Sequence, residues 1–159
     1  MKPLARRNPA LFAWLLCGTL DIAYAAAASV LQGGTVSGML RSVASGPFGN
    51  AAQGWGAAGA IAGLVTHFAI MGAMVAAWFF VARRWRALTA WPWWVTGTLY
   101  GLLLYVVMNG IVLPLRFGLP FPPADAVSGL IALLPHIVLV GWPLAWLTRA
   151  EQQAVPYRG

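Results

Sequence analysis

The chain has 159 residues, of which 60% are hydrophobic and 8% are charged, and its mean hydropathy is +0.75. Soluble domains carry about a quarter charged residues, so this composition excludes an ordinary soluble domain and indicates a single integral membrane domain, residues 1–159. The formal net charge of +7 does not indicate a nucleic-acid partner, because the basic residues lie in short clusters between apolar runs. The chain is therefore predicted to lie in a lipid bilayer.

The first predicted span runs from about residue 10 to residue 31, and Asp21 is the charged residue inside it. A basic start and an apolar run also fit a signal peptide, but Asp21 would then fall in the apolar core or beside the cleavage region. Because three more apolar runs follow, we interpret this segment as a membrane helix. The lone Cys17 within it is expected to be a small packing residue, and its redox state is not readable.

Residues 32–55 form a glycine-containing connection in which Arg41 is the one charged residue. Met39, Leu40 and Val43 have helical spacing, so a short helix at the membrane surface is expected in this first outer loop. The glycines do not match a phosphate-binding or dinucleotide-binding pattern, and we expect them in turns and close contacts.

The second span, about residues 57–82, carries no formal charge and is long enough to cross a hydrocarbon layer of about 30 Å. Steps of four from His67 place Gly59, Gly63 and Met71 on its face of the helix. Small residues allow another helix to come close. This face is therefore predicted to pack against protein and not against lipid.

The third span is predicted over about residues 93–113, after a basic loop and a tryptophan-rich boundary that is typical of a membrane interface. Gly97 and Gly101 lie four apart on one face, and Asn109 continues that face. Pro114 is expected to close the helix, because proline cannot continue regular helical hydrogen bonding.

The fourth span is predicted over about residues 124–146, with a kink near its prolines. The proline-rich segment before it, residues 115–123, is not expected to be a regular helix. Arg116 and Asp125 flank this segment at the outer mouth of the bundle, where they either pair or remain solvated.

The distribution of basic residues predicts the orientation of the four spans. If the N-terminus is cytoplasmic, the cytoplasmic segments hold eight basic residues: Lys2, Arg6, Arg7, Arg83, Arg84, Arg86, Arg149 and Arg158. The outer segments then hold only Arg41 and Arg116. By the positive-inside rule, both termini are expected on the cytoplasmic side of the membrane.

Three polar residues on different spans are predicted to share one depth. Asp21, His67 and His136 each lie ten positions inside the expected outer edge of their span, which is roughly 15 Å at the helical rise. An ionised aspartate facing lipid costs at least about 3 kcal/mol, so Asp21 is expected to face inward. Asn109 lies about a turn and a half shallower, and Tyr24 either hydrogen-bonds at this cluster or packs as an aromatic residue.

Several chemistries fit this cluster of Asp21, His67 and His136. Two histidines and a carboxylate are suitable ligands for zinc or iron, and two histidines at one depth are suitable axial ligands for a haem. An aspartate and a histidine are also able to share a proton.

A structural role is the alternative to a ligand, metal or proton site. The same side chains then hydrogen-bond across helices and fix the packing, and His136 caps a carbonyl freed by the neighbouring proline. Faces rich in Gly and Ala further suggest a partner-binding subunit or a homo-oligomer. No HExxH motif or nucleophile and base pair is present, so an enzyme is not indicated and no catalytic residue is assigned.

The chain resembles a broad class of uncharacterised bacterial four-helix inner-membrane proteins, and more distantly YagU-like proteins. The residues that carry the resemblance are Gly18-Thr19-Leu20-Asp21, Val43-Ala44-Ser45-Gly46, Thr66-His67-Phe68, Met108-Asn109, Leu113-Pro114-Leu115 and His136. YagU-like proteins likewise have a Thr-His in one span, a Pro-Leu before a double proline and a His near the start of the last span. The resemblance implies an all-α four-helix membrane bundle with short loops, and no activity comes with it.

Overall fold

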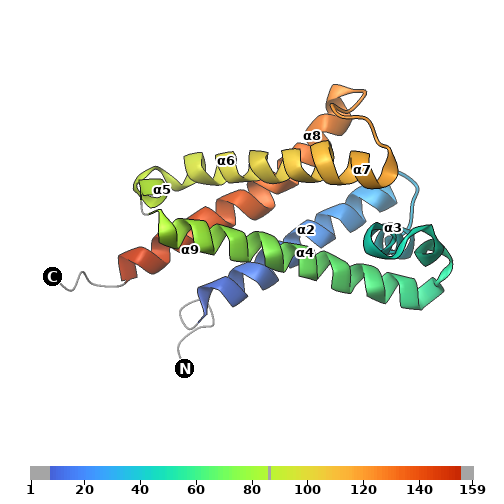
Figure 1. The fold of residues 1–159 in the computed structure, drawn as a ribbon, viewed down its shortest axis with the longest axis horizontal. Coiled ribbons are helices and arrows are strands. Elements are labelled where there is room, and N and C mark those ends of the chain that lie inside the picture. The colour runs from blue at the N-terminus through green and yellow to red at the C-terminus, as the bar shows by residue number, and fades with distance from the viewer. Residues whose placement is uncertain (1–7, 86, 155–159) are drawn as a thin grey trace.

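The computed structural model describes residues 8–85 and 87–154. These residues form an all-α bundle without strands, as predicted, and four of its helical spans are long and apolar enough to cross a membrane (Figure 1). The spans cover Pro9–Leu31, Gly56–Arg84, Trp93–Phe117 and Ala126–Arg149. This arrangement fits a multi-pass membrane protein.

The third and fourth spans are each built from more than one helical type. The elements in chain order are α2 (Pro9–Leu31), α3 (Val36–Phe48), the 3₁₀ turn η1 (Asn50–Gly54), α4 (Gly56–Arg84), α5 (Ala87–Ala90), α6 (Trp93–Tyr105), the π-helical η2 (Val106–Val112), α7 (Leu113–Phe117), α8 (Ala126–Pro135), the π-helical η3 (His136–Gly141) and α9 (Trp142–Ala154).

Three helices begin at a side chain that caps them. Asn8, Thr35 and Asp125 precede α2, α3 and α8, and each side-chain oxygen accepts a hydrogen bond from the backbone N–H three residues further on, at 3.0, 3.0 and 2.8 Å. Each bond satisfies one of the N–H groups that a helix start leaves without an intrahelical partner. Asp125 is therefore the cap of the fourth span, which begins at Ala126 and not at residue 124.

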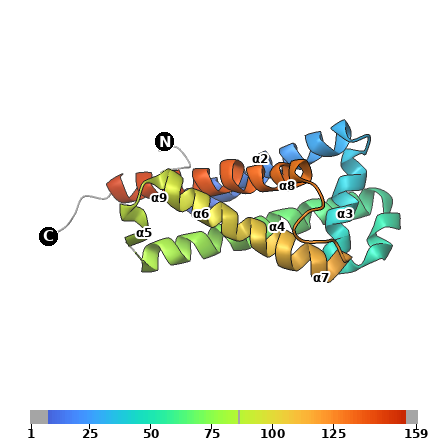
Figure 2. The ribbon, with the colours of Figure 1, turned by 90° about the horizontal axis from the view of Figure 1, so that it is seen from above.

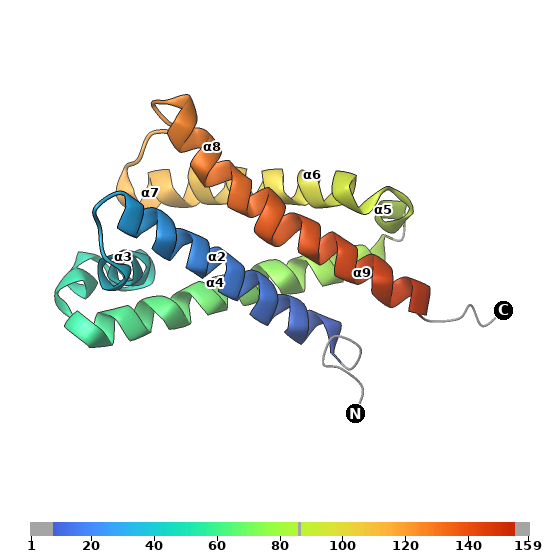
Figure 3. The same cartoon turned by 180° about the vertical axis from the view of Figure 1, so that it is seen from behind.

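The two ends of the bundle differ. The beginning of α2, the end of α9 and the short helix α5 lie together at one end, and α3 lies across the spans at the opposite end (Figures 1 and 2). The view from behind shows the same separation, with α7 and the start of α8 on the α3 side (Figure 3). We refer to these as the α5 end and the α3 end.

The predicted outer-loop helix is present as α3, and it packs tightly on the glycine face of α4. A Cβ atom added to Gly63 would overlap the carbonyl oxygen of Leu40, and one added to Gly59 would lie 2.6 Å from the carbonyl oxygen of Ala52. On another face of α4, Ile61 and Val65 are 65% and 64% exposed, which suits contact with lipid. The small face of the second span therefore packs on protein, and its partner is the connection between the first two spans.

The glycines of the third span allow it to pack closely against the fourth span. A Cβ atom on Gly97 would lie 2.7 Å from the carbonyl oxygen of Gly141, and one on Gly101 would lie 2.6 Å from the carbonyl oxygen of His136. The backbones of α6 and η3 are therefore in direct contact. This contact fixes the position of His136 in the bundle.

One expectation about proline is wrong. The third span does not close at Pro114 but continues to Phe117, because the π-helical η2 widens the turn before the proline and Pro114 occupies the first turn of α7. The fourth span passes through Pro135 into the π-helical η3 and ends in α9 at Arg149, close to the expected end at residue 146.

The hydrophobic core lies toward the α5 end. Its buried members come from α2, α4, α6 and the fourth span, and they include Val75, Trp78 and Leu144. The indole Nε1–H of Trp78 donates to Thr148 Oγ1 at 2.8 Å, and Thr148 in turn donates to the Leu144 carbonyl. This half of the bundle is packed with satisfied side chains, whereas the open space lies between the core and α3.

Candidate functional site

A cavity of about 130 Å³ lies inside the bundle, between the hydrophobic core and α3. Every span and α3 contribute to its wall. The lining residues are Asp21 from α2, Val43 from α3, His67, Ile70, Met71 and Met74 from α4, Met108 from η2, and His136 and Val140 from η3. Asp21, His67 and His136, which the sequence places at one depth, thus line a single cavity.

His67 connects the first two spans. Its Nε2 lies 2.9 Å from the carbonyl oxygen of Gly18, and since a carbonyl only accepts, Nε2 carries the hydrogen. Gly18 permits this approach, because a Cβ atom there would lie 2.6 Å from the ring of Phe68. The other ring nitrogen, Nδ1, lies 3.9 Å from Oδ2 of Asp21.

This arrangement brings the Asp21 carboxyl and the His67 ring together without a direct hydrogen bond, because 3.9 Å is too long for one. With Nε2 protonated, a neutral His67 ring presents a lone pair at Nδ1, which an ionised Asp21 repels. A proton on either partner, or a water molecule that donates one hydrogen to each, removes this repulsion.

Proline chemistry explains the contacts of Tyr24. Pro135 has no N–H, so the carbonyl of Ile131, four residues earlier, loses its usual helical donor. The hydroxyl of Tyr24 on α2 donates to that carbonyl at 2.9 Å. Tyr24 therefore links the first span to the fourth, and it does not line the cavity.

His136 satisfies a second carbonyl beside the proline. Its backbone N–H is directed to the carbonyl of Leu133, which leaves the Ala132 carbonyl to accept from the ring Nδ1–H at 2.7 Å. In the neutral ring, the lone pair is then on Nε2. Among the described residues, no protein group makes a hydrogen bond to Nε2, so the capping role occupies one nitrogen of His136 and leaves the other available to the cavity.

The remaining predicted site residues lie elsewhere. Asn109 donates to the Tyr105 carbonyl of its own span at 3.3 Å and does not line the cavity. Arg116 clamps the C-terminal end of α3 by donating to the carbonyls of Ser45 and Gly46. Among the described residues, Arg116 and Asp125 form no ion pair, because each is engaged with a helix end.

Asp125 has an electrostatic environment set by its capping role. It is fully exposed, and its carboxylate accepts a hydrogen bond from the backbone N–H of Ser128. This bond holds the pKa of the Asp125 carboxyl below its usual value, because it favours the charged form.

The cavity restricts which cofactors fit. Cofactor and drug-sized sites enclose roughly 300–1,000 Å³, so the cavity of about 130 Å³ does not accommodate a haem between the two histidines. Within residues 8–85 and 87–154, no group of three His, Cys, Asp or Glu side chains is arranged to hold a metal ion. The space suits water molecules or one small ion.

Sequence reasoning missed the three methionines of the cavity wall, Met71, Met74 and Met108. Met71 lies one turn after His67 on the same helix face, and Met108 is beside Asn109, so their positions were visible in the sequence. What was not visible is that η2 and η3 turn Met108 and His136 toward the same space.

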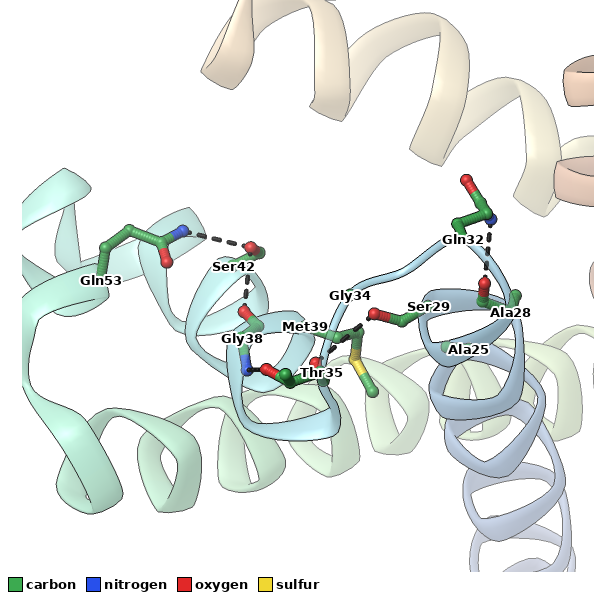
Figure 4. Close-up of a pocket in the computed structure, with 10 residues that line it drawn as sticks. All are labelled: Ala25, Ala28, Ser29, Gln32, Gly34, Thr35, Gly38, Met39, Ser42 and Gln53. Carbon is green, nitrogen blue, oxygen red and sulfur yellow. Dashed lines mark hydrogen bonds between the residues drawn. The ribbon is translucent and has the colours of Figure 1, made fainter.

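A second, open pocket of about 680 Å³ lies at the α3 end, and we call it the vestibule (Figure 4). Its wall comes from the end of α2, the following turn, α3 and η1, and it combines apolar surface with uncharged hydroxyl and amide groups. The lining residues are Ala25, Ala28, Ser29, Gln32, Gly34, Thr35, Gly38, Met39, Ser42 and Gln53. Comparisons of the chain with protein-family models, curated proteins and solved structures gave no match.

Proposed function

We propose that this membrane protein binds and releases a proton at the Asp21–His67 pair, beside a water-containing cavity inside the bundle. The observation that carries this proposal is the geometry of His67. Its Nε2 is committed to the Gly18 carbonyl, and its Nδ1 faces the Asp21 carboxyl at 3.9 Å. A carboxyl and an imidazole in this arrangement share one ionisable proton.

Water completes the proposed site. A volume of about 130 Å³ corresponds to about four molecules at roughly 30 Å³ each. Such waters have polar partners in Asp21, in His67 and in Nε2 of His136, all of which line the cavity. They provide the bridge that the gap between Asp21 and Nδ1 of His67 requires.

The basic residues support a proposed orientation. Arg83, Arg84 and Arg149 flank the α5 end, where α2 begins and α9 ends (Figure 1). The other basic residues of the cytoplasmic set lie outside the described residues: Lys2, Arg6, Arg7, Arg86 and Arg158. By the positive-inside rule we assign the α5 end to the cytoplasm. The assignment to a bacterial inner membrane rests on the resemblance described above. Membership of the YagU-like class is part of the same proposal.

A structural role is the second candidate function. The bonds from His67 to Gly18 and from His136 to Ala132 each satisfy a backbone carbonyl inside the bundle. In that case the polar side chains hold helices together, and the protein acts as a scaffold or as a subunit of a larger membrane assembly.

Infrared difference spectroscopy on the protein in lipid vesicles tests the proton site. We expect the carbonyl stretch of a protonated carboxyl to appear and disappear as pH is varied, and to be absent in Asp21→Asn. Asp125→Asn is the matched control, because Asp125 is exposed at a helix start and its substitution should leave the band in place. If the spectrum shows no titrating band that Asp21→Asn removes, the proton site is rejected, and a lower thermal stability of Asp21→Asn would then favour the structural role.

A further inference from the structure

We propose that the cavity binds a soft monovalent metal cation, copper(I). The ligands are the thioether sulfurs of Met71, Met74 and Met108 together with Nε2 of His136. The cation occupies the same cavity as the proposed proton site, so this assignment rests on that cavity being a binding site and names the ion that it takes.

The methionines are gathered in a way that packing alone does not require. The chain has five, and Met1 lies outside the described residues. The other four all line one of the two pockets: Met71, Met74 and Met108 the cavity, and Met39 the vestibule. Thioether sulfur is a soft ligand and selects copper(I) over harder cations.

The open space beside these side chains is the second observation. Methionine is flexible and usually fills irregular gaps in a core. Here three methionines from two spans border a gap of about 130 Å³ that they leave open. Met71 is only 3% exposed, so it is buried within the bundle, and it also lines the cavity.

His136 has the arrangement of a metal-binding histidine. Ligating imidazoles donate their other ring N–H to a carbonyl or carboxylate, which fixes the tautomer and directs the lone pair at the metal. In this chain Nδ1–H donates to the Ala132 carbonyl at 2.7 Å, and Nε2 has no hydrogen-bonding protein partner among the described residues. This leaves one nitrogen donor for a cation in the cavity.

Charge favours a monovalent ion. Thioethers carry no charge, and Asp21 is the one acidic residue of the cavity wall. One carboxylate balances a single positive charge and not a double one. Harder divalent ions such as zinc prefer several His, Cys or carboxylate donors, and no group of three is arranged for this in residues 8–85 and 87–154.

The vestibule and the cavity are lined by neighbouring turns of the same two helices. On α2, Ala25 lines the vestibule and Asp21, one turn away, lines the cavity. On α3, Met39 lines the vestibule and Val43, again one turn away, lines the cavity. Figure 4 shows the Met39 side chain in the vestibule, outside the set of proposed copper(I) ligands.

The test is anaerobic titration of the purified protein with copper(I) in competition with a chromophoric copper(I) chelator. We expect one copper(I) per chain, with sulfur scatterers in the X-ray absorption spectrum. Met71→Leu combined with Met108→Leu should weaken binding by at least about tenfold, which is the scale on which ligand shells govern metal affinity. Leucine conserves the volume of methionine, so the variant is expected to remain folded, as checked by its thermal unfolding.

Met39→Leu is the matched control, because Met39 lines the vestibule and not the cavity, and its copper(I) affinity should equal that of the unmodified protein. The assignment is overturned if no copper(I) binds, if the spectrum contains only nitrogen and oxygen scatterers, or if the double variant binds as tightly as the unmodified chain. The proton site is judged separately by the infrared band of Asp21. A retained band with no bound copper(I) rejects the copper site alone, whereas bound copper(I) without a titrating band rejects the proton site alone.

Discussion

The hydroxyl of Tyr24 replaces a backbone donor that the sequence lacks. Pro135 cannot donate to the Ile131 carbonyl, and the Tyr24 hydroxyl does so at 2.9 Å from a different span. A carbonyl inside a membrane protein needs such a partner because no bulk water reaches it. One side chain thus compensates for a proline and also joins the first span to the fourth.

Tyr24→Phe is expected to destabilise the bundle by about 1 kcal/mol, the usual value of one interhelical hydrogen bond in a membrane protein. The cost should shrink in a Pro135→Ala background, since the new alanine N–H is able to satisfy the Ile131 carbonyl. Unfolding in mixed detergent micelles measures the four free energies of this double-mutant cycle. Equal costs of Tyr24→Phe in both backgrounds would show that the hydroxyl does not compensate for the proline.

Close contact between backbones holds α3 on α4. Gly63 has the carbonyl of Leu40 where a Cβ atom would be, whereas Gly129, on α8, has no neighbouring atom closer than 3.8 Å to an added Cβ. Both glycines are helical, so they share the intrinsic preference for alanine over glycine and differ in their surroundings.

Gly63→Ala should therefore cost at least about 1–3 kcal/mol, as overpacking usually does, because α3 must move away from α4. Gly129→Ala should be neutral or stabilising by up to about 1 kcal/mol, since alanine is the better helix former. Thermal unfolding of both variants in one detergent is the measurement. If Gly63→Ala is as stable as Gly129→Ala, α3 and α4 do not have the contact described here.

Helix periodicity and charge were enough to predict the four spans, the outer-loop helix and the small faces at Gly59, Gly63, Gly97 and Gly101. Counting residues along each helix also placed Asp21, His67 and His136 at one depth, and these residues line one cavity. The depth of a residue in the membrane follows from the fixed rise per residue of a helix, so it can be calculated from the sequence alone.

Other features depend on which carbonyl is left without a donor, and no local pattern contains that information. The third span continues past Pro114 and the fourth continues past Pro135. The π-helical η2 lies just before Pro114 and η3 follows Pro135, and the sequence did not predict either π-helical segment. The partner of Arg116 is the end of α3, far away in sequence, and not Asp125. Such contacts arise only when the helices pack.

The arrangement of the molecule as a whole predicts where each end lies relative to the membrane. The vestibule is at the α3 end, and Arg84 is at the α5 end with the start of α2 and the end of α9 (Figure 3). If the basic residues mark the cytoplasmic side, the vestibule opens to the outside.

Cysteine labelling in intact cells tests this orientation. Cys17, the one native cysteine, is buried, so a Cys17→Ala chain provides a background for single cysteines in place of Ser42 and Arg84. A membrane-impermeant maleimide should label the Ser42→Cys chain in intact cells and the Arg84→Cys chain only after the cells are opened. The reverse pattern would place the vestibule in the cytoplasm and contradict the assignment.

The short gap between Asp21 and His67 also limits how strongly membrane voltage acts on this pair. A proton that moves between them travels at most 3.9 Å, which is roughly an eighth of a hydrocarbon layer about 30 Å thick. A full crossing is worth about 2.3 kcal/mol per 100 mV, so this movement is worth about 0.3 kcal/mol at most. At the proposed proton site, membrane voltage therefore has little influence on which of the two side chains holds the proton, and it acts mainly on the steps that bring charge to the pair.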